Sequence, residues 1–268
     1  MDNRPIGVFD SGLGGLTVLK EIMELIPSES IVYFGDCGRA PYGTKSKEMV
    51  IKYTFQDIRF LMEHDIKMMV IACNTMSACS LESVKHDFDI PVIEVVQPGS
   101  HCAVRETKNR RVGVIGTSAT VGSGVYEKTI KSIDNSIEVF SKACPLFVNL
   151  VEEGWWENDI AYQIANEYLN DLKKEHIDTL VLGCTHYPLL KGVIQRVMGE
   201  DVKLVSSAME VAKVVREVMQ KDSMLRDNKL NPIYKYYTSD SIEKFDSLGS
   251  SILGKYIDCA ERVEIDKY

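Results

Sequence analysis

Two short segments of this chain share one pattern, and that pattern constrains the fold more than any other feature. They span residues 68–75 and 179–186. In each, an apolar run of the length of a buried strand ends at a small residue, which is followed by a cysteine and then by polar side chains. Cys73 and Cys184 are therefore expected at the carboxyl ends of two strands, the edge where open α/β sheets bind ligands.

The duplication extends beyond the cysteines. Residues 6–12 resemble residues 112–118, so each half also begins with a strand that ends in a polar turn. Asp10 at the first turn precedes its cysteine by 63 positions, and Thr117 at the second turn precedes its own by 67. If two such halves pack face to face, their strand ends share a cleft with one thiol on each wall.

The rest of the chain alternates apolar runs of strand length with stretches of helical periodicity. This alternation is typical of parallel sheets with crossover helices. The longest helical stretches are 46–64 and 157–176, and residues 208–221 have the pattern of an amphipathic helix. Strands are expected at 5–9, 31–34, 68–72, 91–95, 111–115, 136–140, 179–183 and 202–205, with a late strand at 233–238 that could join either sheet.

The predicted fold class is α/β, with two similar lobes that are each a mainly parallel sheet flanked by helices. We expect a pseudo-twofold axis to relate the lobes and the active site to lie between them. A length of 268 residues fits about two domains. The first lobe is assigned to residues 1–97 and the second to residues 98–207. Residues 208–268 are assigned to the first lobe, largely on the family resemblance described below.

Composition and charge narrow the class of protein. A net charge of −8, with no concentrated basic region, argues against nucleic acid as the main partner. No apolar stretch is long enough to span a membrane. The amino terminus passes directly into an expected strand without the basic and apolar regions of a signal peptide. We therefore expect a cytoplasmic protein whose seven cysteines stay reduced.

The strand-end cysteines are the candidates for chemistry. A thiol acts as a base or nucleophile only as the thiolate, which is a few per cent of the population at pH 7 for an unperturbed pKa of about 8.5. His186, two residues after Cys184, can favour the thiolate, and Asp10 can play the matching role for Cys73. Four other cysteines are interpreted as small apolar residues: Cys79, Cys102, Cys144 and Cys259.

Other polar turns leave alternatives open. The glycine-rich turn 10–15 lacks the spacing of a dinucleotide or P-loop motif, so its glycines are interpreted as allowing close approach of a small anion. The loop 36–43 is either a ligand-covering loop or a solvated turn. The hydroxyls of residues 116–120 either face a ligand or cap a helix. Glu152 and Glu153 form a solvated turn or place one carboxylate against the cleft.

A zinc site is the main rival interpretation of the same side chains. Cys73, Cys184 and His186 are all possible zinc ligands, but structural zinc sites usually draw ligands from local pairs such as Cys-x-x-Cys, which this chain lacks. We therefore expect no metal.

Blocks of residues in order along the chain match one family. They are residues 9–16, 35–36 with 41–43, 73–75, 116–117 with 120, 144–147 with 151–154, and 183–189. In these blocks the sequence resembles the glutamate racemases, enzymes that interconvert L- and D-glutamate without a cofactor for bacterial cell-wall synthesis. The resemblance covers nearly the whole chain. It implies two α/β lobes with the site between them.

The resemblance also implies roles for particular residues and an assembly. Cys73 and Cys184 would be the paired proton donor and acceptor, Cys73 facing the α-hydrogen of D-glutamate and Cys184 that of L-glutamate. Asp10, His186 and Glu152 would assist them. The family implies glutamate as the substrate, no cofactor and a homodimer. The residues implied to bind substrate are Asp10, Ser11, Tyr42, Gly43, Asn74, Thr75, Thr117, Thr120, Thr185 and His186.

Three positions refine the comparison. Related aspartate racemases usually carry Glu where this chain has His186, so this residue favours glutamate. Asn149 stands where the family often has Pro. Cys37 stands where it often has Thr, which puts an extra thiol near the expected substrate loop and could confuse alkylation experiments.

The chemistry agrees with this resemblance. An amino-acid α-hydrogen is very weakly acidic, so its removal needs a positioned base, a dry site and donors that stabilise the carboxylate. Inversion then needs a proton from the opposite face, which a second thiol supplies. A two-lobed binding protein would give no reason for a thiol on each wall. A one-thiol decarboxylase or hydrolase would need only one of the cysteines.

Overall fold

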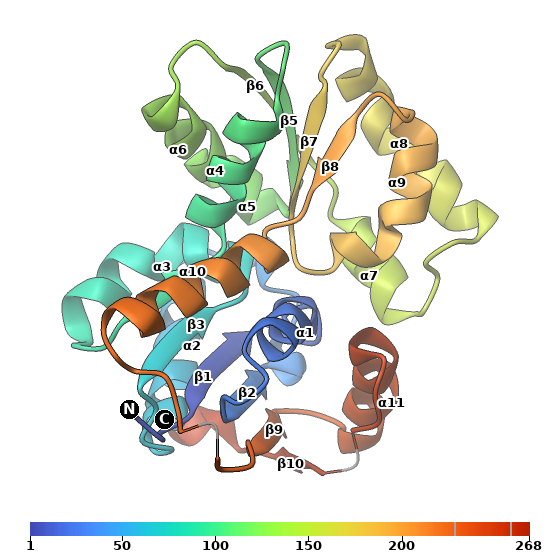
Figure 1. Ribbon diagram of the computed structural model, residues 1–268. Coiled ribbons are helices and arrows are strands. Elements are labelled where there is room, and N and C mark those ends of the chain that lie inside the picture. The colour runs from blue at the N-terminus through green and yellow to red at the C-terminus, as the bar shows by residue number, and fades with distance from the viewer. Residues whose placement is uncertain (228, 258) are drawn as a thin grey trace.

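A computed structural model describes residues 1–227, 229–257 and 259–268 of the chain. Two separate sheets flanked by helices form, one in the lower half and one in the upper half of Figure 1. Every strand pair in them is parallel. The predicted α/β class with parallel sheets is confirmed. No helix within the described residues is long and apolar enough to cross a membrane.

The first sheet has the strand order β10-β9-β2-β1-β3-β4. Its three central strands β1, β2 and β3 are buried at every residue, because both faces of the sheet are covered, and this explains their unbroken apolar sequences. β9 pairs with β2 and extends the sheet on that side. The strands are β1 Ile6–Asp10, β2 Ile31–Gly35, β3 Met68–Ile71, β4 Val92–Glu94, β9 Tyr234–Thr238 and β10 Ala260–Arg262.

The second sheet has the order β6-β5-β7-β8, which repeats the order β2-β1-β3-β4 of the first. In each sheet the first strand of the repeat lies between the second and the third. The duplication inferred from the sequence is therefore present in the topology, while the pseudo-twofold axis stays a prediction. The strands are β5 Arg111–Gly116, β6 Glu138–Ala143, β7 Thr179–Gly183 and β8 Lys203–Val205.

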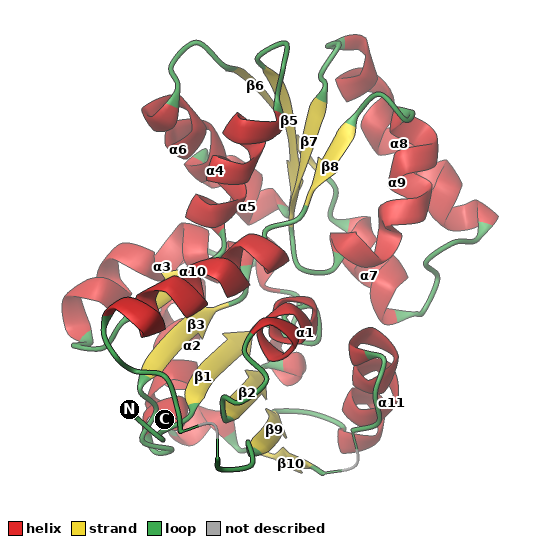
Figure 2. Ribbon diagram, viewed as in Figure 1, coloured by secondary structure: helices red, strands yellow, loops and turns green. Residues whose placement is uncertain are grey.

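The helices lie on the faces of the two sheets, as the red ribbons of Figure 2 show. The two longest begin at side-chain caps, because Ser46 accepts a hydrogen bond from the Met49 amide and Asn158 accepts one from the Ala161 amide. The helices are α1 Leu16–Leu25, α2 Lys47–Met62, α3 Asn74–Asp87, α4 Val96–Glu106, α5 Ser118–Ser123, α6 Val125–Ile133, α7 Leu146–Glu152, α8 Asp159–Lys174, α9 Lys191–Met198, α10 Ala208–Lys221 and α11 Ile242–Leu253.

The segment after β8 returns to the first sheet. Helix α10 packs along α1, and its Val211, Val215 and Met219 are fully buried in the apolar core that this sheet shares with α1. Helix α11 lies beside the same sheet (Figure 1). The boundaries of the two domains stay a prediction.

One strand boundary differs from the expectation, and two further local features were left open by the sequence. β6 begins at Glu138 rather than 136, because the Asp134 carboxylate accepts a hydrogen bond from the Ser136 amide and holds a turn before the strand. The loop after β2 contains two short 3-10 turns, Cys37–Arg39 and Tyr42–Thr44. Glu152 is the last residue of α7 rather than part of a solvated turn.

Candidate active site

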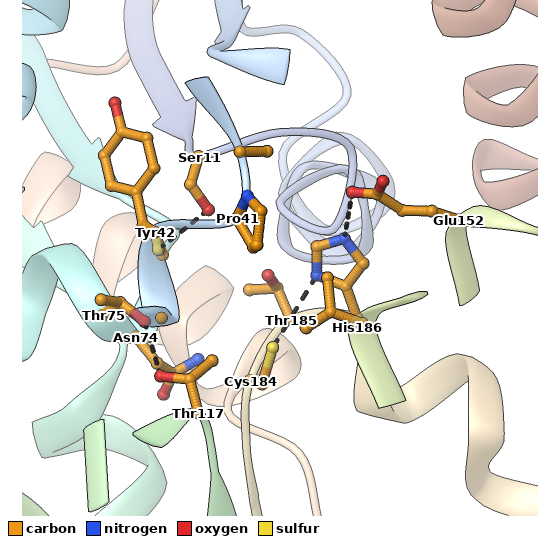
Figure 3. Close-up of a pocket in the computed structure, with 14 residues that line it drawn as sticks. Ser11, Pro41, Tyr42, Asn74, Thr75, Thr117, Glu152, Cys184, Thr185 and His186 are labelled. Atoms are coloured by element: carbon orange, nitrogen blue, oxygen red, sulfur yellow. Dashed lines mark hydrogen bonds and ion pairs between the residues drawn. The ribbon is translucent and has the colours of Figure 1, made fainter. Parts of the chain in front are cut away.

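The carboxyl ends of four strands meet in one pocket between the two sheets. Ser11 follows β1 and Cys73 follows β3, while Thr117 follows β5 and Cys184 follows β7. The cavity is about 20 Å³, room for about one water molecule, so the two lobes enclose it closely. Figure 3 shows the lining side chains. They are Ser11, Ala40, Pro41, Tyr42, Gly43, Cys73, Asn74, Thr75, Thr117, Val148, Glu152, Cys184, Thr185 and His186.

Cys73 lies where β3 turns into α3, and its side chain is buried. Its Sγ donates a hydrogen bond to Ser11 Oγ at 3.4 Å. Burial, followed by the negative charge of Asp10, raises the pKa of the Cys73 thiol well above its ordinary value, although the Ser11 contact works in the opposite direction. Cys73 is therefore held as a neutral thiol in this arrangement.

Cys184 has a different neighbour. Its Sγ lies 3.8 Å from Nδ1 of His186, and His186 Nε2 lies 3.7 Å from Oε1 of Glu152 (Figure 3). Burial opposes a charge on the imidazole, but its contacts with Cys184 and Glu152 outweigh burial and raise the pKa of His186 to about 10. His186 is therefore a cation near neutral pH, and its Nδ1 faces the Cys184 sulfur.

Glu152, the last residue of α7, is the anionic partner of His186. The ion pair with His186 lowers the pKa of the Glu152 carboxyl below its ordinary value, against the effect of partial burial. Its other oxygen lies 3.6 Å from Nζ of Lys244 in α11. Of the adjacent residues Glu152 and Glu153, it is thus Glu152 whose carboxylate faces the pocket. Its neighbour Glu153 is exposed.

Asp10 lies behind the pocket wall rather than in it. Its carboxylate is fully buried and accepts hydrogen bonds from the Gly12 amide at 3.0 Å and from Thr185 Oγ1 at 3.3 Å. Burial raises the pKa of Asp10, and the nearby His186 cation opposes that shift. Besides burial, the charge of Asp10 raises the pKa of Cys73, which is the opposite of the expected support for its thiolate, and the hydrogen bond of this thiol goes to Ser11 Oγ.

Three threonine hydroxyls form a cluster across the two lobes. Thr75 Oγ1 lies 2.9 Å from Thr117 Oγ1 and 3.3 Å from Thr120 Oγ1, and the last two are 3.0 Å apart. Thr117 also accepts a hydrogen bond from the Thr120 amide and caps α5, so the expectation that a hydroxyl of this turn caps a helix is confirmed. Thr120 is buried behind the other two and does not line the pocket.

The loop after β2 forms one wall of the pocket through residues 40–43. A Cβ at Gly43 would lie 2.4 Å from Thr117 Cβ, so only glycine lets the loop approach the second lobe this closely. Tyr42 turns its hydroxyl away from the pocket and donates it to Asp36 (Figure 3). This loop covers the pocket, which favours the ligand-covering interpretation over a solvated turn.

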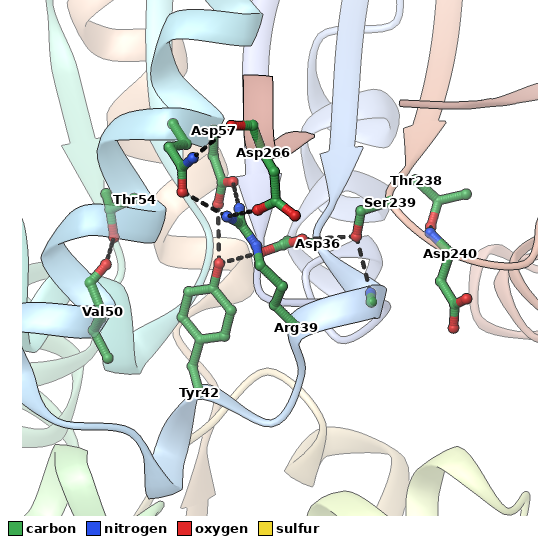
Figure 4. A network of polar contacts seen from close by, with 12 residues as sticks. Asp36, Arg39, Tyr42, Val50, Thr54, Asp57, Thr238, Ser239, Asp240 and Asp266 are labelled. Carbon is green, nitrogen blue, oxygen red and sulfur yellow. Dashed lines mark hydrogen bonds and ion pairs between the residues drawn. The ribbon is translucent and has the colours of Figure 1, made fainter. Parts of the chain in front are cut away.

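A buried polar network holds this loop from behind (Figure 4). The Arg39 guanidinium donates to Asp36 Oδ2 at 2.6 Å and to Asp57 Oδ1 at 2.8 Å. Its other nitrogen donates to Gln56 Oε1 at 2.6 Å. Both aspartates are fully buried. Burial and the adjacent charge of Asp36 raise the pKa of Asp57 well above its ordinary value.

The glycine-rich turn after β1 has a steric role in the structure. A Cβ at Gly14 would lie 2.5 Å from both His186 Nδ1 and Thr185 Oγ1. The missing side chain therefore lets the start of α1 approach the second lobe beside Cys184. Anion binding at this turn stays a prediction.

Two residues at or near the pocket, Val148 and Lys244, were not predicted from the sequence. Val148 carries no chemically reactive group, so its residue type gave no signal, and Ala40 and Pro41 were expected only as part of the loop 36–43. Lys244 is 233 residues from Ser11 and approaches the site only through α11. Cys37 is not in the lining, and burial raises its pKa to about 12, so it is an unreactive thiol near neutral pH.

No group of three or more His, Cys, Asp and Glu side chains in the described part of the chain is arranged to hold a metal ion. The zinc interpretation of Cys73, Cys184 and His186 therefore gains no support there.

Comparison with known proteins agrees with this geometry. The family described as Asp/Glu/hydantoin racemase matches residues 14–215. The chain belongs to this family. The glutamate racemase of Geobacter metallireducens is 49% identical over 251 residues, which cover 94% of this chain and 93% of that protein.

Two solved racemase structures have nearly the same fold. Glutamate racemase isoform RacE1 from Bacillus anthracis matches with a TM-score of 0.95 and 41% identity, covering 98% of both chains. Glutamate racemase from Francisella tularensis, solved in complex with D-glutamate, matches with a TM-score of 0.94 and 40% identity over the full length of both chains. The resemblance to the glutamate racemases is thus confirmed.

Proposed function

We propose that this protein interconverts L- and D-glutamate by proton transfer between the α-carbon and the thiols of Cys73 and Cys184, without a metal or organic cofactor. The observation that carries this proposal is that the thiols after the corresponding strands β3 and β7 line one closed pocket. The related racemases support glutamate as the substrate, including the Francisella tularensis protein solved with D-glutamate. The D-glutamate formed would serve peptidoglycan synthesis, as this relationship implies.

The reaction needs one base and one acid at a time. With L-glutamate, the Cys184 thiolate takes the α-proton while the Cys73 thiol delivers its proton to the opposite face of the carbanion. With D-glutamate the two sulfurs exchange roles. His186 supports this cycle by stabilising negative charge on Cys184, at a distance of 3.8 Å.

Substrate binding is assigned to the polar groups around the thiols. Ser11, Asn74, Thr75, Thr117 and Thr185 offer hydroxyl or amide groups to the two carboxylates and the ammonium group. Tyr42 and Gly43 would contribute through the backbone, because the Tyr42 hydroxyl is bonded to Asp36. Asp10 and Thr120 would act from behind by holding Thr185 and Thr117.

The closed pocket adds a requirement. The pocket is closely enclosed, with a cavity of about 20 Å³, so we expect the lobes or the loop at residues 40–43 to move apart when substrate enters. Enclosure afterwards keeps water from the carbanion. The cytoplasmic location and the homodimer stay predictions.

Substitution of each thiol tests the proposal. Cys73→Ala and Cys184→Ala should each lower kcat/KM in both directions by at least about 100-fold, the scale of general acid–base catalysis. Cys144→Ala is the matched control, because Cys144 is a fully buried cysteine of the second lobe outside the pocket lining. It should stay within about 3-fold of wild type. If one site variant kept more than a tenth of wild-type kcat/KM, a loss below about 1.4 kcal/mol, that cysteine is not an essential base.

Proton NMR in D2O tests the two-base step directly. A thiol holds a single proton, so the proton removed stays on one sulfur while the facing sulfur delivers solvent deuterium. Early product should carry deuterium at the α-carbon while the remaining substrate stays mostly protiated, in both directions. Transfer of α-protium from substrate to product means that a single base serves both faces, and the two-thiol mechanism is then wrong.

A further inference from the structure

A buried tyrosine of the second lobe contacts a pocket residue of the first. Tyr126 in α6 is 2% exposed, and its hydroxyl donates a hydrogen bond to Oδ1 of Asn74 at 2.6 Å. Asn74 is the first residue of α3, directly after Cys73, and it lines the pocket. We propose that Tyr126 is a positioning residue that fixes the side-chain amide of Asn74 with its NH2 group toward the substrate.

The hydrogen-bond inventory of the amide supports this orientation. Asn74 Nδ2 is buried and has no hydrogen-bond partner among the described residues, while Oδ1 is occupied by Tyr126. A buried donor without a partner costs free energy unless a ligand satisfies it. Glutamate offers carboxylate oxygens that can accept this bond.

The phenol fixes which way the amide faces. Burial raises the pKa of Tyr126 well above its ordinary value, so its hydroxyl keeps its hydrogen and acts as a donor. Among the described residues, Asn74 Oδ1 is the one acceptor bonded to that hydroxyl. If the amide turned over, its NH2 group could donate to the phenol oxygen, but the phenol hydrogen would be left without an acceptor among the described residues.

The sequence around Cys184 makes room for this tyrosine. A Cβ at Gly183 would lie 3.0 Å from Tyr126 Cε2, and one at Gly99 would lie 3.4 Å from the hydroxyl oxygen. The ring therefore packs directly against the residue before Cys184 while its hydroxyl reaches the residue after Cys73. One side chain thus touches the backbone next to one thiol and the side chain next to the other.

A double-mutant cycle tests the inference, which rests on the proposed function. Tyr126→Phe keeps the ring and removes the hydroxyl. It should lower kcat/KM for glutamate about 5- to 50-fold in both directions, with most of the change in KM, because the Asn74 contact would be made with bound substrate as well as in the transition state. Asn74→Ala should lower kcat/KM by at least as much. The double variant should fall within 2-fold of Asn74→Ala.

Tyr187→Phe is the matched control. Tyr187 is another buried tyrosine of the second lobe, and its hydroxyl donates to the Cys144 carbonyl at 2.8 Å rather than to a pocket side chain. The fold-losses of kcat/KM in Tyr187→Phe and Asn74→Ala should multiply in the double variant, as expected for two residues that act independently. If the effects of Tyr126→Phe and Asn74→Ala also multiply, Tyr126 has only a structural role and the inference is wrong.

A second measurement separates this inference from the proposed function. In protein labelled with ¹⁵N-asparagine, the side-chain amide signals of Asn74 are identified by their loss in Asn74→Ala. These signals should shift in Tyr126→Phe and stay in place in Tyr187→Phe, whatever reaction the protein catalyses. Unshifted signals in Tyr126→Phe refute the inference, whereas a wild-type protein that does not racemise glutamate refutes the proposed function.

Discussion

The buried polar network behind the loop after β2 leads to a quantitative prediction about the stability of the fold. Asp36 and Asp57 share the single guanidinium of Arg39, at 2.6 Å and 2.8 Å, and both carboxyl groups are fully buried (Figure 4). We predict that Arg39→Met destabilises the fold far more than Asp57→Asn, although each substitution removes one member of the same network.

The magnitudes follow from the partners that each variant leaves behind. Without Arg39, the Asp36 carboxylate is buried with no cation beside it, and breaking a buried ion pair in this way costs about 3–5 kcal/mol. Burial and the charge of Asp36 raise the pKa of Asp57 well above its ordinary value. Its carboxyl therefore keeps its proton to a higher pH in the folded protein than in the unfolded chain. An asparagine is its close mimic, because its oxygen can accept from Arg39 and its NH2 can donate to Tyr42. Asp57→Asn should therefore cost less than about 1 kcal/mol.

Urea unfolding of the two variants and wild type, repeated from pH 5 to pH 8, is the measurement. The native state holds the Asp57 proton more tightly than the unfolded chain, whose Asp pKa is about 3.9. The Asp57 contribution to stability is therefore full below that value and is lost as the pH rises through the folded pKa. Asp57→Asn lacks this loss, so its stability relative to wild type should rise with pH. If Arg39→Met and Asp57→Asn lower the free energy of unfolding equally, Asp57 is not neutral in the folded protein.

Three further outcomes are expected. His186→Gln should lower kcat/KM equally in both directions, by at least about 10-fold, because it removes the cation beside Cys184; circular dichroism of each enantiomer's conversion measures this. Lys244→Ala should change kcat/KM by less than about 3-fold, since Lys244 is half exposed and its ion pair with Glu152 is screened by solvent; a large effect assigns it a role in catalysis. L-Aspartate should be a poor substrate, because a side chain one methylene shorter cannot reach its donors while the α-carbon stays between the thiols; comparable kcat/KM for both acids contradicts this.

The parts of the fold that depend on local pattern were predictable from the sequence. Unbroken apolar runs marked the buried strands β1, β3, β5 and β7, because strands covered on both faces lose the alternation of half-exposed ones. The amphipathic pattern of residues 208–221 matches helix α10 at both ends. The placement of both cysteines followed from these strands, since parallel strands end at the same edge of a sheet.

The parts that depend on contacts between distant residues were not predictable in this way. Tyr126 meets Asn74 across 52 positions, and Arg39 meets Asp57 across 18. Each pair joins two elements whose relative placement no local pattern encodes. The same limit explains why Asp10, which follows the pattern of a strand-end site residue, lies behind the wall: Ser11, one position later, faces the pocket instead.

The two thiols are equivalent in topology but not in surroundings, and the proposed reaction needs that inequality. Proton transfer requires one thiolate and one thiol at the same moment. The His186 cation lies 3.8 Å from the Cys184 sulfur, whereas burial and the charge of Asp10 raise the pKa of Cys73. If Cys184 takes the α-proton of L-glutamate, as proposed, this arrangement favours L-glutamate, and conversion of D-glutamate would first require a proton to move from Cys73 to Cys184. Since the free enantiomers are equally stable, this preference cannot appear in the ratio of the two kcat/KM values, and its effect is confined to kcat, KM and isotope effects.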